Sequence, residues 1–320
     1  MTTLLWSILL LLAAAITVVA AELFIGHLTK SSSKKEIPSF LSFAIPVFLV
    51  ALPELLIALI ATWKDFSSMV PTYVTGANLI NLLLIPGIMA LTAGSFISQK
   101  EENLKQIPFL LGSVALFLVF SMNGQIELWE GLVLFLTFAA FGASRYKDFK
   151  LGIWERIERL FHSLTEGESH SPSNSASSLI LWFLILLVGA FFTVKGVSTI
   201  SEAQNWNPGY LASSVVALAV SVPEMVFAIR AAKKGNGDAA VNVLMASSVL
   251  NLTLVVATSA FVKPLNVLDD VVSISNTFLL LATLLFCFSL LLRKWSGSQG
   301  AVLVLIYFVF LVQFLNPLFS

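Results

Sequence analysis

The sequence Leu52-Pro53-Glu54 lies inside a long apolar run of this chain, and the Pro-Glu pair returns inside a second apolar run as Val222-Pro223-Glu224. In both copies an asparagine follows the glutamate at the same distance, Asn81 in the first and Asn251 in the second. A carboxylate inside a membrane costs roughly 2.5–3.5 kcal/mol even on the most lenient insertion scale. A chain that bears this cost twice, in register, predicts that the charge is used.

The proline before each glutamate predicts a break in the helix, because proline has no N–H and its ring displaces the carbonyl four residues back. Pro53 and Pro223 therefore leave under-satisfied carbonyl oxygens beside the glutamates, at Leu49 and Ala219. Carboxylate, free carbonyl and amide oxygens are the ligands of a hard cation. A purely structural carboxylate is the alternative, and acids inside membranes are more often functional.

Composition places the chain among helical membrane proteins. Of its 320 residues, 58% are hydrophobic and 11% are charged, and the mean hydropathy is +0.92. No soluble domain can bury so large an apolar fraction. We expect an all-α polytopic membrane protein with ten transmembrane helices, at about 4–25, 39–63, 70–98, 107–122, 128–144, 179–202, 209–232, 238–262, 269–292 and 301–318.

Basic residues gather in alternate connections, whereas the opposite connections carry only Lys64 and Lys263. By the positive-inside rule, the basic loops lie in the cytoplasm and both termini lie outside. The largest connection, 146–178, is one of the cytoplasmic loops and separates five spans in 1–145 from five in 179–320. We expect a multi-pass protein of the cell membrane whose partners are the lipid bilayer and inorganic cations, with no indication of nucleic acid or of a protein partner.

The two halves share more than the Pro-Glu pair. The shift in residue number that carries Glu54 onto Glu224, called the repeat shift below, also aligns Lys64 with Lys234 and two alanines with two alanines. Because each half has an odd number of spans, the second half enters the membrane from the opposite side. The sequence therefore predicts two inverted-topology five-helix repeats, an arrangement in which secondary transporters place the substrate site at the midplane between the halves.

Neutral oxygen donors accompany the glutamates in this register. Asn81 and Asn251 are expected on a helix that faces the Pro-Glu helix, and Ser247 lies one turn before Asn251. Hydrogen bonding between helices is the alternative role for such small polar residues. The repeat register favours a cation site, for which the candidates are Glu54, Glu224, Asn81, Asn251, Ser221 and Ser247, with Leu49 and Ala219 as carbonyl ligands.

Catalytic functions have little support in the sequence. Residues 235–238 match the Gly-x-Gly-Asp pattern of intramembrane aspartyl proteases, but they fall in a predicted turn, and no second intramembrane aspartate accompanies them. The three histidines lack metal-ligand spacing, and the sequence has no phosphate loop and no dinucleotide fingerprint. We therefore expect no enzyme and no cofactor beyond the transported ions.

At these motifs the chain resembles the cation/calcium antiporter superfamily, particularly the short prokaryotic sodium/calcium exchangers. That family has two inverted five-helix repeats, each with a signature like Gly-Thr-Ser-x-Pro-Glu followed by Gly-Ser-Asn-x-x-Asn on the next helix. Residues 51–54 and 76–81 match the first copy, and residues 221–224 and 246–251 match the second. The resemblance covers essentially the whole chain. It implies a secondary antiporter that exchanges Ca²⁺, or a related divalent cation, for Na⁺ or H⁺ by alternating access, with the first and sixth spans sliding against the others.

The chain departs from the family signature at hydroxyl positions. Val50, Ala51, Ala77 and Val220 stand where the family has threonine or serine. The resemblance implies that those hydroxyls help to hold sodium, so their loss predicts that protons couple at least as well as sodium. Stoichiometry, direction of transport and oligomeric state stay open. A non-transporting or regulatory protein of the same fold is the alternative, against which the retention of both glutamates argues, and an intramembrane enzyme is less favoured.

Overall fold

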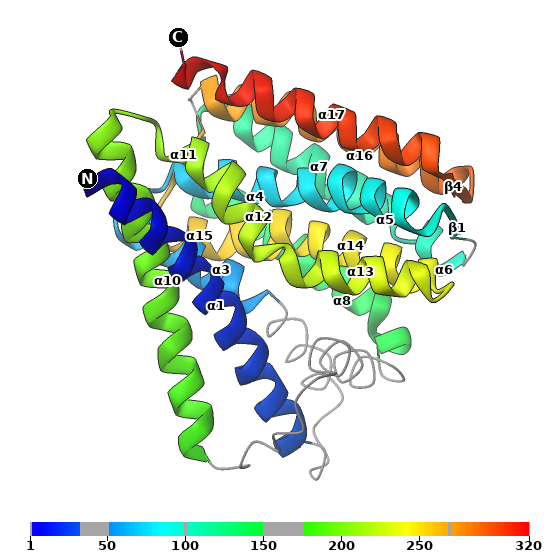
Figure 1. Cartoon of the computed structure of the whole chain (residues 1–320), viewed down its shortest axis with the longest axis horizontal. Helices are drawn as coiled ribbons and strands as arrows, with labels where there is room; N and C mark the ends of the chain where they lie inside the picture. Colours follow the sequence, from blue (N-terminus) through cyan, green and yellow to red (C-terminus); the bar gives the residue numbers. More distant parts are fainter. Residues whose placement is uncertain (1, 33–50, 99–100, 150–175, 268–269, 320) are drawn as a thin grey trace.

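The computed structural model describes residues 2–32, 51–98, 101–149, 176–267 and 270–319, and almost all of them are helical (Figure 1). The α-helices are α1 (Thr2–Ser32), α3 (Leu52–Trp63), α4 (Met69–Leu79), α5 (Ile85–Ala93), α6 (Glu101–Leu104), α7 (Ile107–Phe120), α8 (Leu128–Phe149), α10 (Ala176–Gln204), α11 (Pro208–Leu211), α12 (Ala217–Val220), α13 (Val222–Lys233), α14 (Gly237–Leu250), α15 (Val256–Val262), α16 (Asp270–Leu291) and α17 (Gly297–Leu315).

Short irregular turns and strands interrupt or connect these helices. The π-helical turns are η1 (Ile80–Leu84), η3 (Ala212–Val216) and η4 (Asn251–Val255), and the 3-10 turns are η2 (Ser121–Asn123) and η5 (Asn316–Leu318). The strands are β1 (Ser95–Ile97), β2 (Gln125–Ile126), β3 (Leu265–Asn266) and β4 (Lys294–Ser296).

Described helices lie in all ten ranges that the sequence predicts as spans. Six described helices are long and apolar enough to cross a membrane, or seven if the bent pair formed by Pro208–Val220 and Val222–Lys233 counts as one span. Helices α3, α7 and α8 contain shorter apolar segments. The chain is therefore an all-α, multi-pass membrane protein, while the number of ten crossings stays a prediction.

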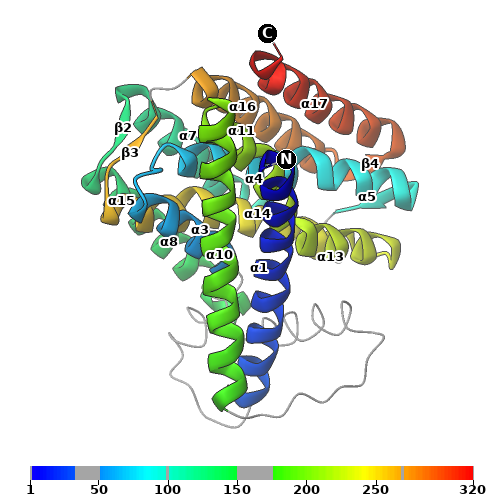
Figure 2. The same ribbon diagram turned by 60° about the vertical axis from the view of Figure 1, so that its left-hand side comes forward.

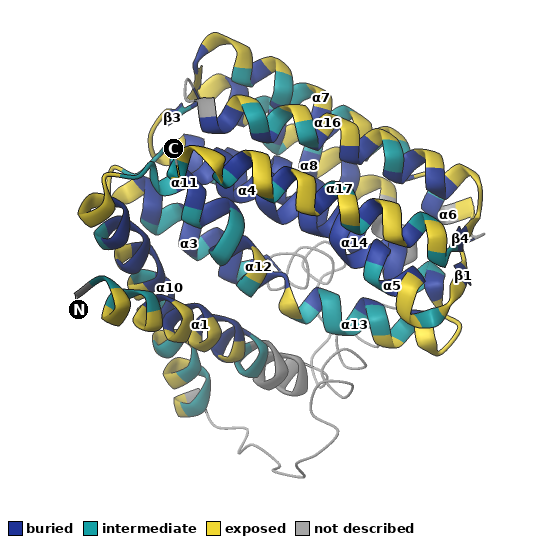
Figure 3. Cartoon of the chain, turned by 45° about the horizontal axis from the view of Figure 1, so that its top comes forward, coloured by how far each residue is buried: buried dark blue, intermediate teal, exposed yellow. Residues whose placement is uncertain are grey.

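Two spans form the centre of the bundle. The span built from α4, η1 and α5 is 89% buried, and the span built from α14, η4 and α15 is 83% buried. The other four long spans are 22–44% buried, and Figure 3 shows exposed residues along the outer sides of α1, α16 and α17. Apolar side chains such as Leu305 and Val312 are exposed there. Such a surface is what a lipid-facing helix presents.

The strand pairs join the two halves of the chain. Strand β1 pairs with β4, so that Ser95 faces Ser296, and β2 pairs with β3, so that Ile126 faces Leu265. Both pairs are antiparallel. The repeat shift converts the first pairing into the second, register included. Figure 3 shows β1 and β4 at the opposite end of the bundle from β3.

The helix packing follows the same shift. Helix α5 packs on α17, and α15 packs on α8. Helix α13 packs on α5, and α3 packs on α15. The repeat shift carries both ends of α3 onto the ends of α13, and it brings the π-helical turn η1 onto η4 within one residue.

Helices α1 and α10 pack closely on each other and contact the rest of the bundle mainly through α3, α11 and α12. They lie side by side and cross the bundle steeply (Figures 1 and 2). A Cβ atom on Gly189 would lie 2.7 Å from the hydroxyl oxygen of Thr17, and one on Gly196 would lie 3.1 Å from the Cβ of Leu10. Small residues therefore let the two backbones approach closely, as is common between membrane helices.

Candidate cation site

The Pro-Glu helix of the second half is broken at the predicted place. Helix α12 ends at Val220, α13 begins at Val222, and the two segments are bent by 47°. Ser221 lies at the break, and Pro223 has no N–H to offer the carbonyl of Ala219. In the first half α3 begins at Leu52 with proline in its first turn. The proposed carbonyl ligand Leu49 lies outside the described residues.

Both glutamates are buried in the first turns of their helices. Glu54 is 5% exposed and Glu224 is 8% exposed. The backbone N–H of each glutamate favours the negative charge of its carboxylate, and so does the positive end of the helix dipole. The Oε2 atom of each has no hydrogen-bond partner among the described residues. The charge of Glu224 also acts on the carboxylate of Glu54, so the two groups lie within electrostatic reach of each other.

Glu130 shows what a structural carboxylate looks like in this protein. It is buried, but its Oε1 accepts a hydrogen bond of 2.9 Å from Nδ2 of Asn123. Its Oε2 accepts a second bond of 2.8 Å from the backbone N–H of Glu127. Its oxygens are therefore satisfied within the protein, whereas Glu54 and Glu224 each keep one free oxygen in the interior.

The two signature asparagines lie in the π-helical turns. Asn81 belongs to η1 and Asn251 begins η4, and both are buried. The Nδ2 atom of Asn81 donates a hydrogen bond of 3.1 Å to Oγ of Ser247, which links the two halves across the site. The Oδ1 atom of Asn81 stays without a partner among the described residues. Turns of this kind are often found at functional sites.

Four further buried oxygen atoms lie on elements that carry or contact the candidate residues. Oδ1 of Asn78, Oγ of Ser213, Oγ of Ser248 and the hydroxyl of Tyr73 are all buried and without partners in the described part of the chain. Asn78 and Ser248 neighbour the predicted ligands in the sequence, so their inclusion could have been inferred. Ser213 could be noticed only as a hydroxyl in an apolar run.

Packing of α4 on η3 brings Ser213 to the site. A Cβ atom on Gly76 would lie 2.2 Å from the backbone oxygen of Ser213 and 2.5 Å from its Oγ. Glycine is therefore required at position 76, because any side chain would separate the two helices. Helix α1 also contributes to the electrostatics, since the charge of Glu22 repels that of Glu224.

Three of the four positions that lack the family hydroxyls are described in the structure, and all three are buried. Ala51, Ala77 and Val220 present methyl groups to the interior, and Val50 lies outside the described residues. Ala77 corresponds to Ser247 under the repeat shift. The hydrogen bond between Asn81 and Ser247 therefore has no counterpart between Asn251 and position 77.

The donor set suits a hard cation. Carboxylate, amide and hydroxyl oxygens are the usual ligands of Ca²⁺ and of similar ions. Among the described residues there is no group of three or more His, Cys, Asp or Glu that could hold a metal ion. The two carboxylates with neutral oxygens around them fit a hard cation, whereas zinc centres are built mainly from cysteine and histidine.

Known proteins resemble both halves of the chain. A family model described as sodium/calcium exchanger protein matches residues 5–146 and 174–316. The sodium/calcium exchanger MaX1 of Methanosarcina acetivorans is 22% identical over 95% of this chain and 97% of its own. The putative antiporter CaxA of Alkalimonas amylolytica is 30% identical over 43% of this chain, and the match spans 43% of CaxA.

Solved structures share the fold. The H⁺/Ca²⁺ exchanger CAX superposes with a TM-score of 0.68 at 20% identity, covering 99% of this chain and 85% of its own. The sodium-calcium exchanger NCX_Mj superposes with a TM-score of 0.58 at 19% identity, covering 96% of this chain and 98% of its own. The family match extends over most of the sequence and includes both Pro-Glu motifs. This chain belongs to the sodium/calcium exchanger protein family.

Proposed function

We propose that this protein is a secondary antiporter that exchanges Ca²⁺, or a related divalent cation, for Na⁺ or H⁺ across the membrane. The observation that carries the proposal is that Oε2 of Glu54, Oε2 of Glu224 and Oδ1 of Asn81 are buried without hydrogen-bond partners among the described residues. Burying an unpaired polar group is costly, at about 1–3 kcal/mol each. A cation that binds these atoms removes the penalty, which explains why the protein retains them.

The transported ion would lie between the two halves. Ca²⁺ takes about six to eight oxygen ligands in proteins. Two carboxylates of opposite halves neutralise its charge, and neutral oxygens complete its shell. The ligands we propose are Glu54, Glu224, Asn81, Asn251, Ser221 and Ser247, joined by Asn78, Ser213 and Ser248 and by the carbonyl oxygens of Leu49 and Ala219.

Alternating access follows from inverted repeats in this proposal. The repeat shift maps one strand pair onto the other, and it maps the main helix contacts onto one another. This correspondence supports two repeats, 1–145 and 179–320, joined by the loop 146–178. The moving element is the pair of α1 and α10, which crosses the other helices steeply and contacts them mainly through α3, α11 and α12 (Figure 2). Its sliding would open the site to one side of the membrane and then to the other.

The charges at the two ends of the bundle support the orientation. Basic residues Lys233, Lys234 and Lys294 adjoin the end that carries β1 and β4, where the backbone at Gly237 packs against Phe96. The other end carries the ion pair of Asp65 with Lys263. We therefore place the β1–β4 end in the cytoplasm and both termini outside.

Protons are the counter-ion that we favour. Ala51, Ala77 and Val220 place methyl groups where sodium would need oxygen, whereas a proton needs only a carboxylate that can titrate. Ca²⁺ and protons would then occupy Glu54 and Glu224 in turn. Binding of Ca²⁺ and binding of protons then exclude each other at the same two carboxylates, which is sufficient for coupled exchange.

Flux of radioactive calcium into proteoliposomes tests the proposal. We expect uptake driven by a pH gradient in the absence of sodium, and at most similar uptake in a sodium gradient at constant pH. Liposomes with the Glu54→Gln/Glu224→Gln variant are the control for leakage. Uptake that follows sodium alone would exclude proton coupling, and no gradient-driven uptake of any divalent cation would favour a non-transporting protein of this fold.

A further inference from the structure

We propose that the hydroxyl of Tyr73 is a ligand of the divalent cation at the proposed site, on the side of Val220. The proposal rests on the cation site proposed above. It adds a specificity-determining residue that stands in only one half of the chain, because the repeat shift places Val243 at the corresponding position.

Tyr73 is anchored in the middle of the bundle. It is 1% exposed and belongs to α4. Helix α4 contacts α3, α12, η3 and η4, and these or the residues beside them carry Glu54, Ser221, Ser213 and Asn251. A side chain on α4 therefore reaches the site from a helix that touches most of its other walls.

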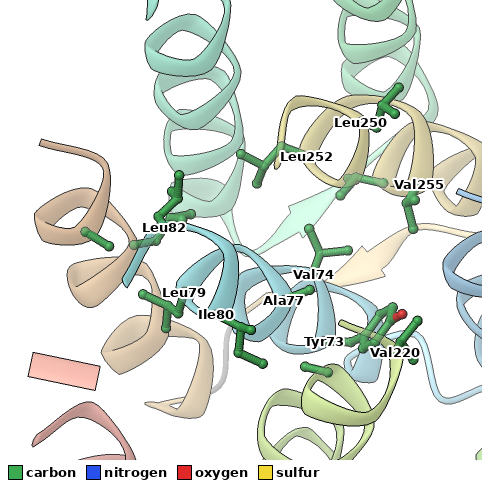
Figure 4. Packing of buried hydrophobic residues seen from close by; sticks show 14 of the residues in the cluster. Tyr73, Val74, Ala77, Leu79, Ile80, Leu82, Val220, Leu250, Leu252 and Val255 are labelled. Atoms are coloured by element: carbon green, nitrogen blue, oxygen red, sulfur yellow. The ribbon is translucent and has the colours of Figure 1, made fainter. Parts of the chain in front are cut away.

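The tyrosine points along the face of α4 that carries site residues. Tyr73 and Ala77 are four residues apart, and Asn81 follows after four more, so all three lie on one side of the helix. Figure 4 shows the ring of Tyr73 beside Val220, with its hydroxyl on that side. The phenol thus lies beside one of the positions at which a hydroxyl is missing.

The hydroxyl of Tyr73 has no hydrogen-bond partner among the described residues. Buried tyrosine hydroxyls normally have one. The negative charges of both Glu54 and Glu224 act on this hydroxyl, so its surroundings include both carboxylates. A buried hydroxyl without a partner, within electrostatic reach of two carboxylates, would gain a partner in a cation that binds all three.

A purely structural role makes a different prediction. If Tyr73 only fills space, phenylalanine fills it equally well, because the two side chains differ by one oxygen atom. A ligand role instead predicts weaker cation binding with unchanged folding. The dependence of uptake on pH should change little, because the carboxylates of Glu54 and Glu224 carry the proton.

Tyr73→Phe in proteoliposomes separates these roles, with Tyr307→Phe as the matched control, since Tyr307 is buried in α17 outside the site. We expect the Ca²⁺ concentration for half-maximal uptake to rise about tenfold in Tyr73→Phe, the size expected for one hydrogen-bond-strength contact to a charged species. The maximal rate should stay within about twofold. Tyr307→Phe should match the unmodified protein in both quantities.

A rescue variant tests whether a hydroxyl at position 220 can replace the hydroxyl of Tyr73. Val220→Thr in the Tyr73→Phe background should recover most of the lost affinity, which a space-filling role cannot explain. Thermal stabilisation of the purified protein by Ca²⁺ gives a second reading, and the shift should shrink in Tyr73→Phe while the ion-free midpoint stays the same.

The outcomes distinguish the role of Tyr73 from the proposed function. Equal half-saturation for Tyr73→Phe and Tyr307→Phe, in a protein that exchanges Ca²⁺, would overturn the role of Tyr73 and leave the antiporter intact. If the unmodified protein neither exchanges nor binds a divalent cation, the proposed function fails, and the ligand role fails with it.

Discussion

Among single residues, Ala77 and Ser247 show that the site is asymmetric. Ser247 accepts a hydrogen bond from Asn81, and the corresponding position in the first half carries only a methyl group. The serine hydroxyls of the site all come from the second half, whereas the first half supplies carboxylate, amide and phenol oxygens. The two halves therefore treat a bound ion differently although their backbones match.

The carboxylates are the first residues to test. Glu54→Gln and Glu224→Gln should each lower Ca²⁺ exchange by about 100-fold or more, because an unneutralised buried charge costs about 3 kcal/mol or more. Uptake in proteoliposomes measures the loss, and thermal unfolding should show that the variants still fold. Glu202→Gln, at an exposed glutamate near the end of α10, is the matched control. Near-normal uptake in either site variant would remove the two-glutamate site.

Hydroxyl restoration tests the choice of counter-ion. Ala77→Ser together with Val220→Thr should increase the dependence of uptake on sodium, since both positions are buried and would again present oxygen. In the unmodified protein, lower pH should weaken Ca²⁺ uptake, because protons compete for the same carboxylates. Initial rates over a grid of pH and sodium concentration measure both effects. A double variant as indifferent to sodium as the unmodified protein would contradict the hydroxyl argument.

Sequence reasoning identifies those residues of the proposed site that carry a local signal. The glutamates stand beside prolines in apolar runs, and the asparagines follow at a fixed spacing, so both pairs are visible without a structure. Ser213 and Tyr73 have no such signal, because only the packing of α4 against η3 and α12 brings their side chains to the site. Residues of this kind depend on which helices become neighbours.

At the scale of elements, the broken helices set the geometry of the site. The break between α12 and α13 was predictable from Pro223, since proline removes a backbone hydrogen bond. The π-helical turns at η1 and η4 were not, because a single extra residue per turn leaves no mark on the apolar pattern. Each turn changes the rotation of the helical segment on its C-terminal side, and the asparagines Asn81 and Asn251 stand at these places.

Removing the helix break between α12 and α13 should raise thermal stability and lower transport. Pro223→Ala restores an N–H for the carbonyl of Ala219, which should straighten the helix and raise the thermal midpoint while lowering Ca²⁺ uptake by about tenfold or more. Pro317→Ala, in the terminal turn η5, should leave uptake unchanged. Unaltered uptake in Pro223→Ala would mean that the break is incidental to the site.

At the scale of the whole molecule, sidedness distinguishes inverted from parallel halves. In a Cys287→Ser background, Ala203→Cys at the exposed end of α10 should react with a membrane-impermeant reagent only from outside. Ser298→Cys, exposed beside β4, should react only from the cytoplasm. Met122→Cys, exposed in η2 at the corresponding connection of the first half, should react only from outside. Reaction of Met122→Cys and Ser298→Cys from the same side would reject the inverted repeats. Sequence alone could predict the sides from charge, but it could not reveal which helices of the two halves touch.

The strand pairs determine whether the two halves of the chain can fold independently. Since β1 pairs with β4 and β2 with β3, and since α5 packs on α17 and α8 on α15, the halves are interlocked and share one buried cluster. They are not modules that fold separately. Fragments 1–150 and 175–320 should fail when expressed singly and should complement each other when expressed together, co-purifying through a tag on one of them. Stable single fragments would show that each half completes a core without its counterpart.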